Sequence, residues 1–211
     1  MSDELVLYTN PMSRGRIARW MMEELGQPYR AEIVGFGGPM KSAAYRAINP
    51  MGKVPALVHG ATIVTECAAI CAYLADAFPQ AGLAPTPGDH RRGPYYRWMF
   101  FAAGPIEAAV TNKAFGLEPP PERAVSVGYG TYADVMNTLE YAVSQAEYLA
   151  GDRFSAADVY VGSQLQWGLQ FGTIEKRPAF EAYGARLAAR PAALRAKQID
   201  DELMAQMQKA G

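Results

Sequence analysis

Cysteine is scarce in this chain: its 211 residues include only two, Cys67 and Cys71. The two lie four positions apart on one predicted helix, where a disulfide would be awkward, and they form no C-x-x-C redox pair. Two reduced thiols fit a reducing compartment, so we expect a cytoplasmic protein.

Net charge is also nearly absent. Twenty basic residues face 21 acidic ones, for a formal charge of −1, and the basic residues form no aromatic-interleaved stripe, so nothing indicates a nucleic acid partner. No apolar run approaches the roughly 20 residues that a membrane span needs. The start, Met1-Ser2-Asp3-Glu4, is not that of a signal peptide. We expect a soluble protein with no membrane partner.

Motifs for metals and nucleotides are missing as well. No group of His, Cys, Asp and Glu has metal-ligand spacing, and the sequence contains no P-loop, G-x-G-x-x-G segment or nucleophile elbow. We therefore predict no metal site.

The residues that are present divide into two parts. Half of the chain is apolar, and a chain of this length can bury well over about 60% of its unfolded surface. A proline- and glycine-rich stretch over residues 79–94 separates a βα pattern from a purely helical one. We predict an α/β domain over residues 1–80 and an all-α domain over residues 90–211.

The first half has the order βαβ and then ββα. Strand 5–8 ends in a polar turn, and a helix from Arg14 stops at Gly26. Later strands are expected at 29–34, 56–58 and 61–64, and a helix at 66–78. Helices of the second half are expected at 92–115, 124–149, 155–170 and 178–190, with a tail helix to about 209.

Residues 49–55, Asn-Pro-Met-Gly-Lys-Val-Pro, are the most informative segment. Pro55 opens an apolar strand, cannot donate to a sheet ladder and holds Val54 extended. Val54 can therefore offer its own N–H and C=O to an added peptide. A cis bond would mark a built site, because only about 5–6% of X-Pro bonds in folded proteins are cis. The alternative is a proline that simply opens a strand.

Ser13 lies at the amino end of the first predicted helix. A serine there is usually a cap whose oxygen accepts a backbone N–H, which stabilises by about 0.5–2 kcal/mol. In the functional interpretation its hydroxyl points at a ligand, where the helix end favours negative charge. Both interpretations stay open on these residues alone.

Four segments together resemble the thioredoxin-like half of the cytosolic glutathione transferases. They are residues 7–16 (Leu-Tyr-Thr-Asn-Pro-Met-Ser-Arg-Gly-Arg), 23–26 (Glu-Glu-Leu-Gly), 49–57 (Asn-Pro-Met-Gly-Lys-Val-Pro-Ala-Leu) and 65–70 (Thr-Glu-Cys-Ala-Ala-Ile). The resemblance implies a bacterial, serine-type member with a thioredoxin-like domain (βαβ-ββα, cis-Pro) followed by an all-α domain. Ser155 to Asp158 looks like the capping box of that helical domain, so Asp158 is interpreted as a folding residue.

The resemblance also implies that glutathione is the co-substrate and that Ser13 is the catalytic residue. The Ser13 hydroxyl would hydrogen-bond the sulfur as thiolate, and Tyr8 and Arg14 are rivals for this role. Since a serine cannot form a mixed disulfide, glutaredoxin-like reduction is disfavoured.

Further contacts follow from the same resemblance. The main chain of Val54, beside Pro55, would pair with the cysteinyl residue, and Glu66 and Cys67 would hold the γ-glutamyl end. Taken alone, Glu66 is an acid at the amino end of a helix, where its interaction with the helix dipole stabilises the helix by about 0.3–1 kcal/mol. The family usually has serine where this chain has Cys67, and a thiol is the weaker donor. Two lysines are candidates for the glycyl carboxylate: Lys53 and, by a looser match, Lys41.

The electrophile is expected to meet five apolar side chains: Met12, Trp98, Phe101, Phe115 and Trp167. Aromatic residues at helical spacing also fit an ordinary core. We predict a transferase that conjugates glutathione to a hydrophobic electrophile or reduces a peroxide with two thiol equivalents, as a homodimer like most of the family. Two alternatives stay open: a non-catalytic glutathione-binding scaffold, and a glutathione-dependent isomerase, although the Ser-Ser-Cys signature of maleylacetoacetate isomerases is absent around Ser13.

Overall fold

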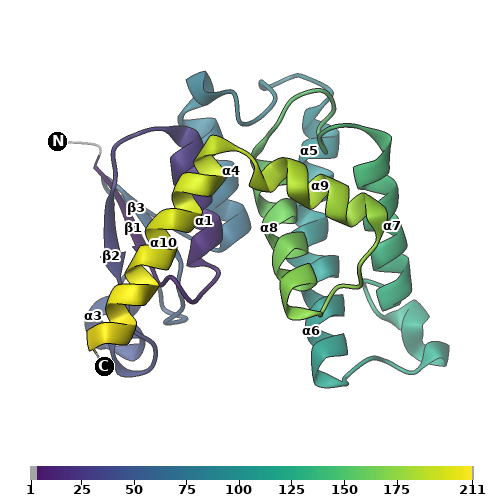
Figure 1. Ribbon diagram of the computed structural model, residues 1–211, viewed down its shortest axis with the longest axis horizontal. Coiled ribbons are helices and arrows are strands. Elements are labelled where there is room, and N and C mark those ends of the chain that lie inside the picture. Colours follow the sequence, from purple (N-terminus) through teal and green to yellow (C-terminus); the bar gives the residue numbers. More distant parts are fainter. Residues whose placement is uncertain (1–3, 211) are drawn as a thin grey trace. The chain divides into compact units, whose positions relative to one another are not determined.

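The computed structural model describes residues 4–210 of the chain (Figure 1). It divides into two compact units, Met1–Ala81 together with Ala189–Gly211, and Gly82–Ala188. No helix in the described part of the chain has the length and apolar character of a membrane span.

The first unit is built on a mixed four-stranded sheet of order β2-β1-β3-β4. β1 runs parallel to β2 and antiparallel to β3, and β3 runs antiparallel to β4. The parallel pair needs a crossover connection, which α1 provides. The predicted thioredoxin-like order is thereby confirmed. The strands are β1 (Leu5–Thr9), β2 (Arg30–Ile33), β3 (Ala56–His59) and β4 (Thr62–Thr65).

Helix α1 (Gly15–Leu25) is buried on nearly all sides because it packs against β1, α4 (Cys67–Ala77) and α10 (Pro191–Ala210). Figure 1 shows α10, in yellow, lying along α1, in purple. The helix ends at Gly26, whose φ of 68° lies in the left-handed region that glycine adopts without steric cost. The predicted stop is therefore confirmed.

Two short helices lie between β2 and β3: α2 (Gly38–Lys41) and α3 (Ala43–Arg46). Val34, Met40 and Tyr45 form a small buried cluster there, and Tyr8 and Val54 pack against it. This cluster supports the loop that leads into β3.

Helix α10 departs from the predicted division into domains. The sequence predicts an all-α domain over residues 90–211, but residues 189 onward group with the first unit. The physical reason is a set of contacts with α1, among them an ion pair between Arg19 and Asp200 in which both side chains are buried.

The second unit is helical. The helix predicted over 92–115 is divided by the π-helical segment Ala102–Ile106, which contains Pro105. Proline has no N–H for the helical ladder, so the turn widens there. The helices are α5 (Arg92–Phe101), α6 (Glu107–Phe115), α7 (Tyr132–Gln145), α8 (Ala156–Phe171) and α9 (Pro178–Ala188), with 3-10 turns at Pro79–Ala81 in the first unit and at Pro121–Ser126.

Asp158, at the start of α8, anchors the second unit. Its carboxylate accepts hydrogen bonds from the backbone N–H of Ser155 and of Leu149, both at 2.9 Å, and from the Tyr183 hydroxyl at 2.8 Å. Burial raises the pKa of this carboxyl group, while the hydrogen bonds lower it. The capping box is present as predicted, and Asp158 has a role in the fold.

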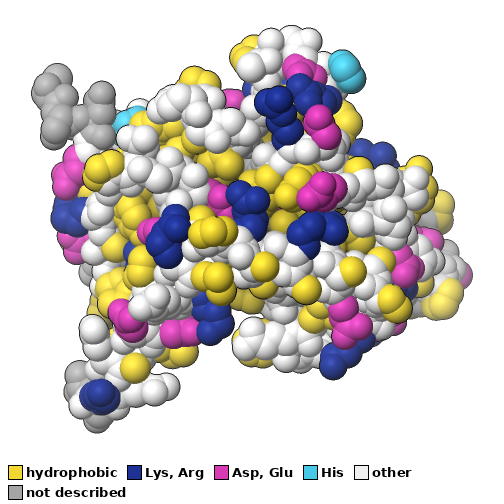
Figure 2. Space-filling model, turned by 45° about the horizontal axis from the view of Figure 1, so that its top comes forward, with side chains coloured by type: hydrophobic (Ala, Val, Ile, Leu, Met, Phe, Trp, Pro, Cys, Tyr) yellow, Lys and Arg dark blue, Asp and Glu magenta, His cyan; other side chains and the backbone are white. Residues whose placement is uncertain are grey.

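Charged side chains of both signs are interspersed with apolar ones on the face drawn in Figure 2. The ion pairs of the described residues include partly exposed ones, for example Arg177 with Glu140 at 2.7 Å and Arg91 with Asp152 at 3.0 Å. Such pairs contribute about 0–1 kcal/mol each to stability.

Candidate active site at the end of the sheet

Three segments meet at one end of the sheet. Ala56 of β3 pairs with Tyr8 of β1 on one side and with Thr65 of β4 on the other. Val54 lies two residues before Ala56, while the other two strands continue into the loop of Ser13 and into the first turn of α4. The strand register thus brings these parts of the predicted site together.

The Val54-Pro55 peptide bond is cis, as predicted, and β3 begins directly after it at Ala56. The Val54 side chain is half-buried against Tyr45 and its neighbours. Within residues 4–210, no hydrogen bond uses the backbone N–H or C=O of Val54. An extended peptide has a free donor and acceptor to pair with at this point.

Ser13 is half-buried in a turn built around Asn10. Its Oγ donates to the Asn10 carbonyl at 2.7 Å and accepts the N–H of Gly15 at 2.9 Å. The Asn10 side chain accepts the N–H of Met12 and donates to the carbonyl of Val34, both at 2.9 Å. Ser13 therefore satisfies the N–H of Gly15, the first residue of α1, although the N-cap position itself is Arg14 and has no side-chain cap. A hydroxyl hydrogen rotates to suit its acceptor, so the same oxygen can also donate to a ligand.

Gly15 allows the start of α1 to lie against the end of β1. A Cβ atom at this position would stand 2.0 Å from Oγ1 of Thr9 and 3.0 Å from Oγ of Ser13. No other residue fits unless the Thr9 side chain or the loop moves.

The first turn of α4 lies beside the first turn of α1. The Cys67 thiol donates to the carbonyl of Arg14 over 3.6 Å. The preceding residue, Glu66, is exposed and has a φ of 68°, the one positive φ among the non-glycine residues that the structure describes. Such a conformation costs about 1–3 kcal/mol and is concentrated at functional sites. Two helix amino ends in one place favour an anionic ligand.

The two predicted lysines have different surroundings. Lys41 Nζ donates to the carbonyl oxygens of residues 51 and 52, at 2.9 and 2.8 Å, and so fixes that turn. Lys53 is exposed, and its side chain has no partner in the described part of the chain. Its carbonyl accepts hydrogen bonds from Tyr45 Oη and Asn49 Nδ2, both at 2.7 Å.

Tyr8 and Arg14, the two rivals of Ser13, flank the same loop. The ring of Tyr8 lies 5.9 Å from that of Tyr45. Burial, and to a lesser extent electrostatic repulsion from Tyr8, raises the pKa of Tyr45 to about 12. Arg14 is exposed at the N-cap of α1. Three residues that shape this region, Asn10, Tyr45 and Asn49, were not predicted as site residues. Asparagine in a tight turn is a usable signal, whereas nothing in the sequence singles out Tyr45.

The five side chains predicted for the electrophile have unlike environments. Trp98 is buried and packs edge-on against Phe101, with ring centroids 5.4 Å apart, so it presents little surface. Trp167 is half-buried in α8. Phe115, 73% exposed at the end of α6, and Met12, 56% exposed, offer free apolar surface.

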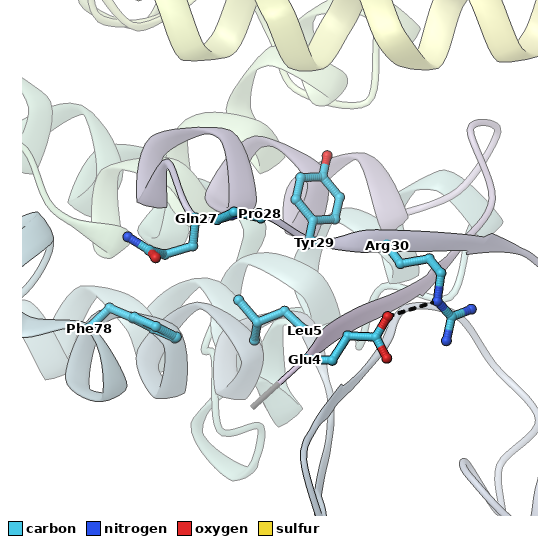
Figure 3. A pocket seen from close by; sticks show the side chains of 7 residues that line it. All are labelled: Glu4, Leu5, Gln27, Pro28, Tyr29, Arg30 and Phe78. Carbon is cyan, nitrogen blue, oxygen red and sulfur yellow. Dashed lines mark hydrogen bonds and ion pairs between the residues drawn. The ribbon is translucent and has the colours of Figure 1, made fainter. Parts of the chain in front are cut away.

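A separate hollow of about 600 Å³ lies at the start of β1 (Figure 3). The loop of Ser13 follows the other end of this strand. An ion pair between Glu4 Oε1 and Arg30 Nε, 3.1 Å apart, lies at its rim, and the Tyr29 hydroxyl points away from Leu5. The lining residues are Glu4, Leu5, Gln27, Pro28, Tyr29, Arg30 and Phe78. None of the predicted site residues lines this hollow.

Both halves of the chain match one family of known proteins. Residues 12–77 match the N-terminal domain of glutathione S-transferase, and residues 117–191 match its C-terminal domain. The chain belongs to the glutathione S-transferase family. Within the described residues, this family member has no group of three or more His, Cys, Asp or Glu side chains that can hold a metal ion.

Individual glutathione S-transferases are similar over most of their length. GstA of Escherichia coli O157:H7 is 29% identical over 167 residues, which cover 77% of this chain and 78% of GstA. The theta-class enzyme of Xanthomonas axonopodis pv. citri, solved with glutathione bound, is 31% identical with a TM-score of 0.70 and covers 92% of this chain and 97% of its own. A sphingomonad glutathione S-transferase complexed with glutathione is 27% identical with a TM-score of 0.76. The match covers 93% of this chain and 98% of the sphingomonad protein.

Proposed function

We propose that this protein is a serine-type glutathione transferase that binds glutathione at the sheet end of Ser13, Val54 and Glu66. The observation that carries the proposal is the main chain of Val54, beside Pro55, which has no hydrogen-bond partner among the described residues 4–210. A γ-glutamyl-cysteinyl-glycine peptide can add there as a short extended strand, and the two glutathione-bound relatives support this choice of ligand.

Each part of the tripeptide has a matching group. The cysteinyl N–H and C=O pair with Val54, the γ-glutamyl ammonium with the exposed Glu66 carboxylate, and the γ-glutamyl carboxylate with the amino end of α4 at Cys67. We assign the glycyl carboxylate to Lys53, whose ammonium has no partner in the part of the chain that the structure describes. Lys41 comes second, because two of its three N–H donors already hold the turn.

Ser13 can supply the activation that the sulfur needs. A thiol with a pKa of about 8.5 is only a few per cent thiolate at pH 7, and lowering the pKa by two units requires about 2.7 kcal/mol. A hydrogen bond to a charged group contributes about 1.5–3 kcal/mol, and a helix amino end up to about 1. One hydroxyl and the start of α1 therefore suffice.

The bound thiolate then acts as the nucleophile. Its sulfur forms a bond to an electrophilic carbon, the leaving group departs with its bonding electrons, and the thiol proton has already passed to solvent. With a peroxide the thiolate sulfur forms a bond to one oxygen as the O–O bond breaks, and the other oxygen leaves as an alcohol. A second glutathione then attacks the sulfur of the resulting sulfenic acid, which gives the disulfide and releases water. Ser13 itself forms no covalent bond.

Ultraviolet titration of bound glutathione tests the assignment. In the wild type we expect a thiol pKa about two units below the free value. In Ser13→Ala we expect a return toward the free value, with about 25-fold lower turnover of a chloronitroarene at pH 7, because the thiolate fraction falls from about three quarters to about 3%. Tyr8→Phe and Arg14→Gln are the matched controls and should retain the low pKa. An unchanged pKa in Ser13→Ala contradicts the role of Ser13. Tight binding at an ordinary thiol pKa without turnover would identify a scaffold protein instead.

We also propose a cytoplasmic homodimer, as is usual in the family. Sedimentation equilibrium measures the assembly state, and a monomer at micromolar concentration would contradict it. Fractionation of the native host's cells tests the compartment.

A further inference from the structure

Two consecutive acids of α10 bind two arginines of α1. Asp200 lies 3.2 Å from Arg19, with both side chains buried, and Asp201 lies 2.7 Å from Arg16, with side chains 39% and 22% exposed. Arg16 and Arg19 are three residues apart and so lie on one side of α1. The two ion pairs place this side of α1 against α10, and α10 runs along α1 in Figure 1.

Arg16 also reaches the loop that carries Ser13. Its Nε donates to the Pro11 carbonyl at 2.5 Å, while Nη2 donates to Asp201 Oδ1 at 2.7 Å and to Met204 Sδ at 3.3 Å. A guanidinium is planar and its donors are fixed relative to one another. The position of Asp201 therefore constrains the position of the Pro11 carbonyl, two residues before Ser13.

The second oxygen of Asp201 accepts a hydrogen bond from Lys197 at 2.5 Å, one turn earlier in α10. Asp201 is thus held on its own helix while it orients Arg16. Ion pairs with this degree of exposure add little to global stability, and the buried pair of Arg19 and Asp200 already docks the helix. The contribution of Asp201 is to geometry rather than to the stability of the unit.

We propose that Asp201 is a positioning residue for the reaction: through Arg16 it fixes the Pro11 carbonyl and thereby the orientation in which Ser13 meets the sulfur. This inference rests on the proposed role of Ser13. It makes the last helix of the chain part of the support of the active-site loop.

The test compares Asp201→Ala with Arg195→Ala. Arg195 is the matched control because it also joins α10 to α1, through Glu23, but within the described residues it has no hydrogen bond or ion pair to the loop of Ser13. In Asp201→Ala we expect the amide hydrogens of Met12 and Ser13 to exchange about tenfold faster. We also expect the pKa of bound glutathione to rise by about one unit, with turnover about tenfold lower at pH below that pKa and an unchanged KM for glutathione.

Arg195→Ala should leave the amide exchange rates and the thiol pKa at their wild-type values. Asp201→Glu should retain most of the wild-type behaviour, because it keeps a carboxylate for Arg16. Unchanged amide exchange in Asp201→Ala overturns the inference whatever Ser13 does. Faster exchange with an unchanged thiol pKa also overturns it, provided that Ser13→Ala raises that pKa. If Ser13→Ala leaves the thiol pKa unchanged, the proposed role of Ser13 fails and this inference fails with it, even if the exchange result shows that Asp201 orders the loop.

Discussion

The hydroxyl of Ser13 donates to the backbone carbonyl of Asn10 at 2.7 Å, and the Ser13 N–H reaches the same oxygen at 3.0 Å. A bound sulfur must therefore compete with this carbonyl for the hydroxyl proton. When the proton turns to the sulfur, the carbonyl keeps its N–H bond, so no buried acceptor is left without a partner. The turn is suited to a hydroxyl that changes acceptors.

Asn10→Ala should weaken both the fold and the thiol activation. It removes the side-chain hydrogen bonds to Val34 and Met12, and we expect a loss of about 1–3 kcal/mol in the free energy of unfolding, measured in urea, together with a raised pKa of bound glutathione. Asn49→Ala is the control, because it also removes two hydrogen bonds but in the loop before Val54. It should lower glutathione affinity and leave the thiol pKa in place; the same shift in both variants would contradict this division.

Gly15→Ala should displace the start of α1, since its Cβ would stand 2.0 Å from Oγ1 of Thr9. We expect a loss of about 1–3 kcal/mol in stability from overpacking. Addition of Thr9→Ala removes the clashing atom and should recover part of the loss, which a double-mutant cycle measures. Equal stability of the single and double variants would mean that Thr9 is not the obstacle.

Cys67→Ser should preserve or tighten glutathione binding measured by calorimetry, because a hydroxyl is a stronger donor than a thiol at the amino end of α4. Cys71→Ser is the control: Cys71 is fully buried one turn later, and burial raises the pKa of its thiol. A hydroxyl there should cost stability without changing affinity. A large loss of affinity in Cys67→Ser would show that the thiol itself has a role.

Asp158→Ala should act on stability and not on catalysis. It leaves the donors of Leu149, Ser155 and Tyr183 without their buried acceptor, and we expect a loss of about 3 kcal/mol or more. Asp134→Ala, which removes the carboxylate that accepts hydrogen bonds from the N–H and the hydroxyl of Thr131 in the exposed capping box of α7, should lose much less. Both should keep the wild-type KM for glutathione at temperatures where they are folded; a raised KM in Asp158→Ala alone would indicate a link to the site.

Asp89 should titrate in the folded protein with a pKa of about 2, because hydrogen bonds from the side chain and backbone of Arg91 favour its charged form. In the unfolded chain the pKa of an aspartate is about 3.9. Since the folded pKa is the lower one, this interaction stabilises the fold above about pH 4, and the contribution is lost as the pH falls toward 2. Carboxyl carbon NMR measures the titration, and Arg91→Gln should raise the pKa; an ordinary value in the wild type would contradict the contact.

Local sequence signals predicted much of the first unit. The turn after β1 and the stop at Gly26 each follow from the backbone preferences of a few adjacent residues. The cis bond at Pro55 was implied by the family resemblance, because local preference favours trans. The capping box at Ser155 is equally local. The approximate ends of most strands and helices follow from hydrophobic period alone.

Other features depend on partners far away in the chain. The sequence indicates a helix at α10 but not that it packs on α1, because an apolar face does not specify which surface will cover it. Arg19 lies on a predicted amphipathic helix and is nevertheless buried, because it pairs with Asp200. The sequence does not indicate this pair, since the two residues are 181 positions apart. Tyr45 and Asn10 likewise shape the site through contacts that no spacing rule identifies.

The sequence by itself determined the order of the elements, the family and the residue types available for thiol chemistry, because these depend on short-range sterics and on motifs read along the chain. Only the tertiary structure decided that the Ser13 hydroxyl faces Asn10 and that Asp201 reaches the loop of Ser13 through Arg16. The tertiary structure also decided that the main chain of Val54 has no hydrogen-bond partner among residues 4–210. Such contacts form when strand register and helix packing join distant segments, and local backbone preferences do not predict them.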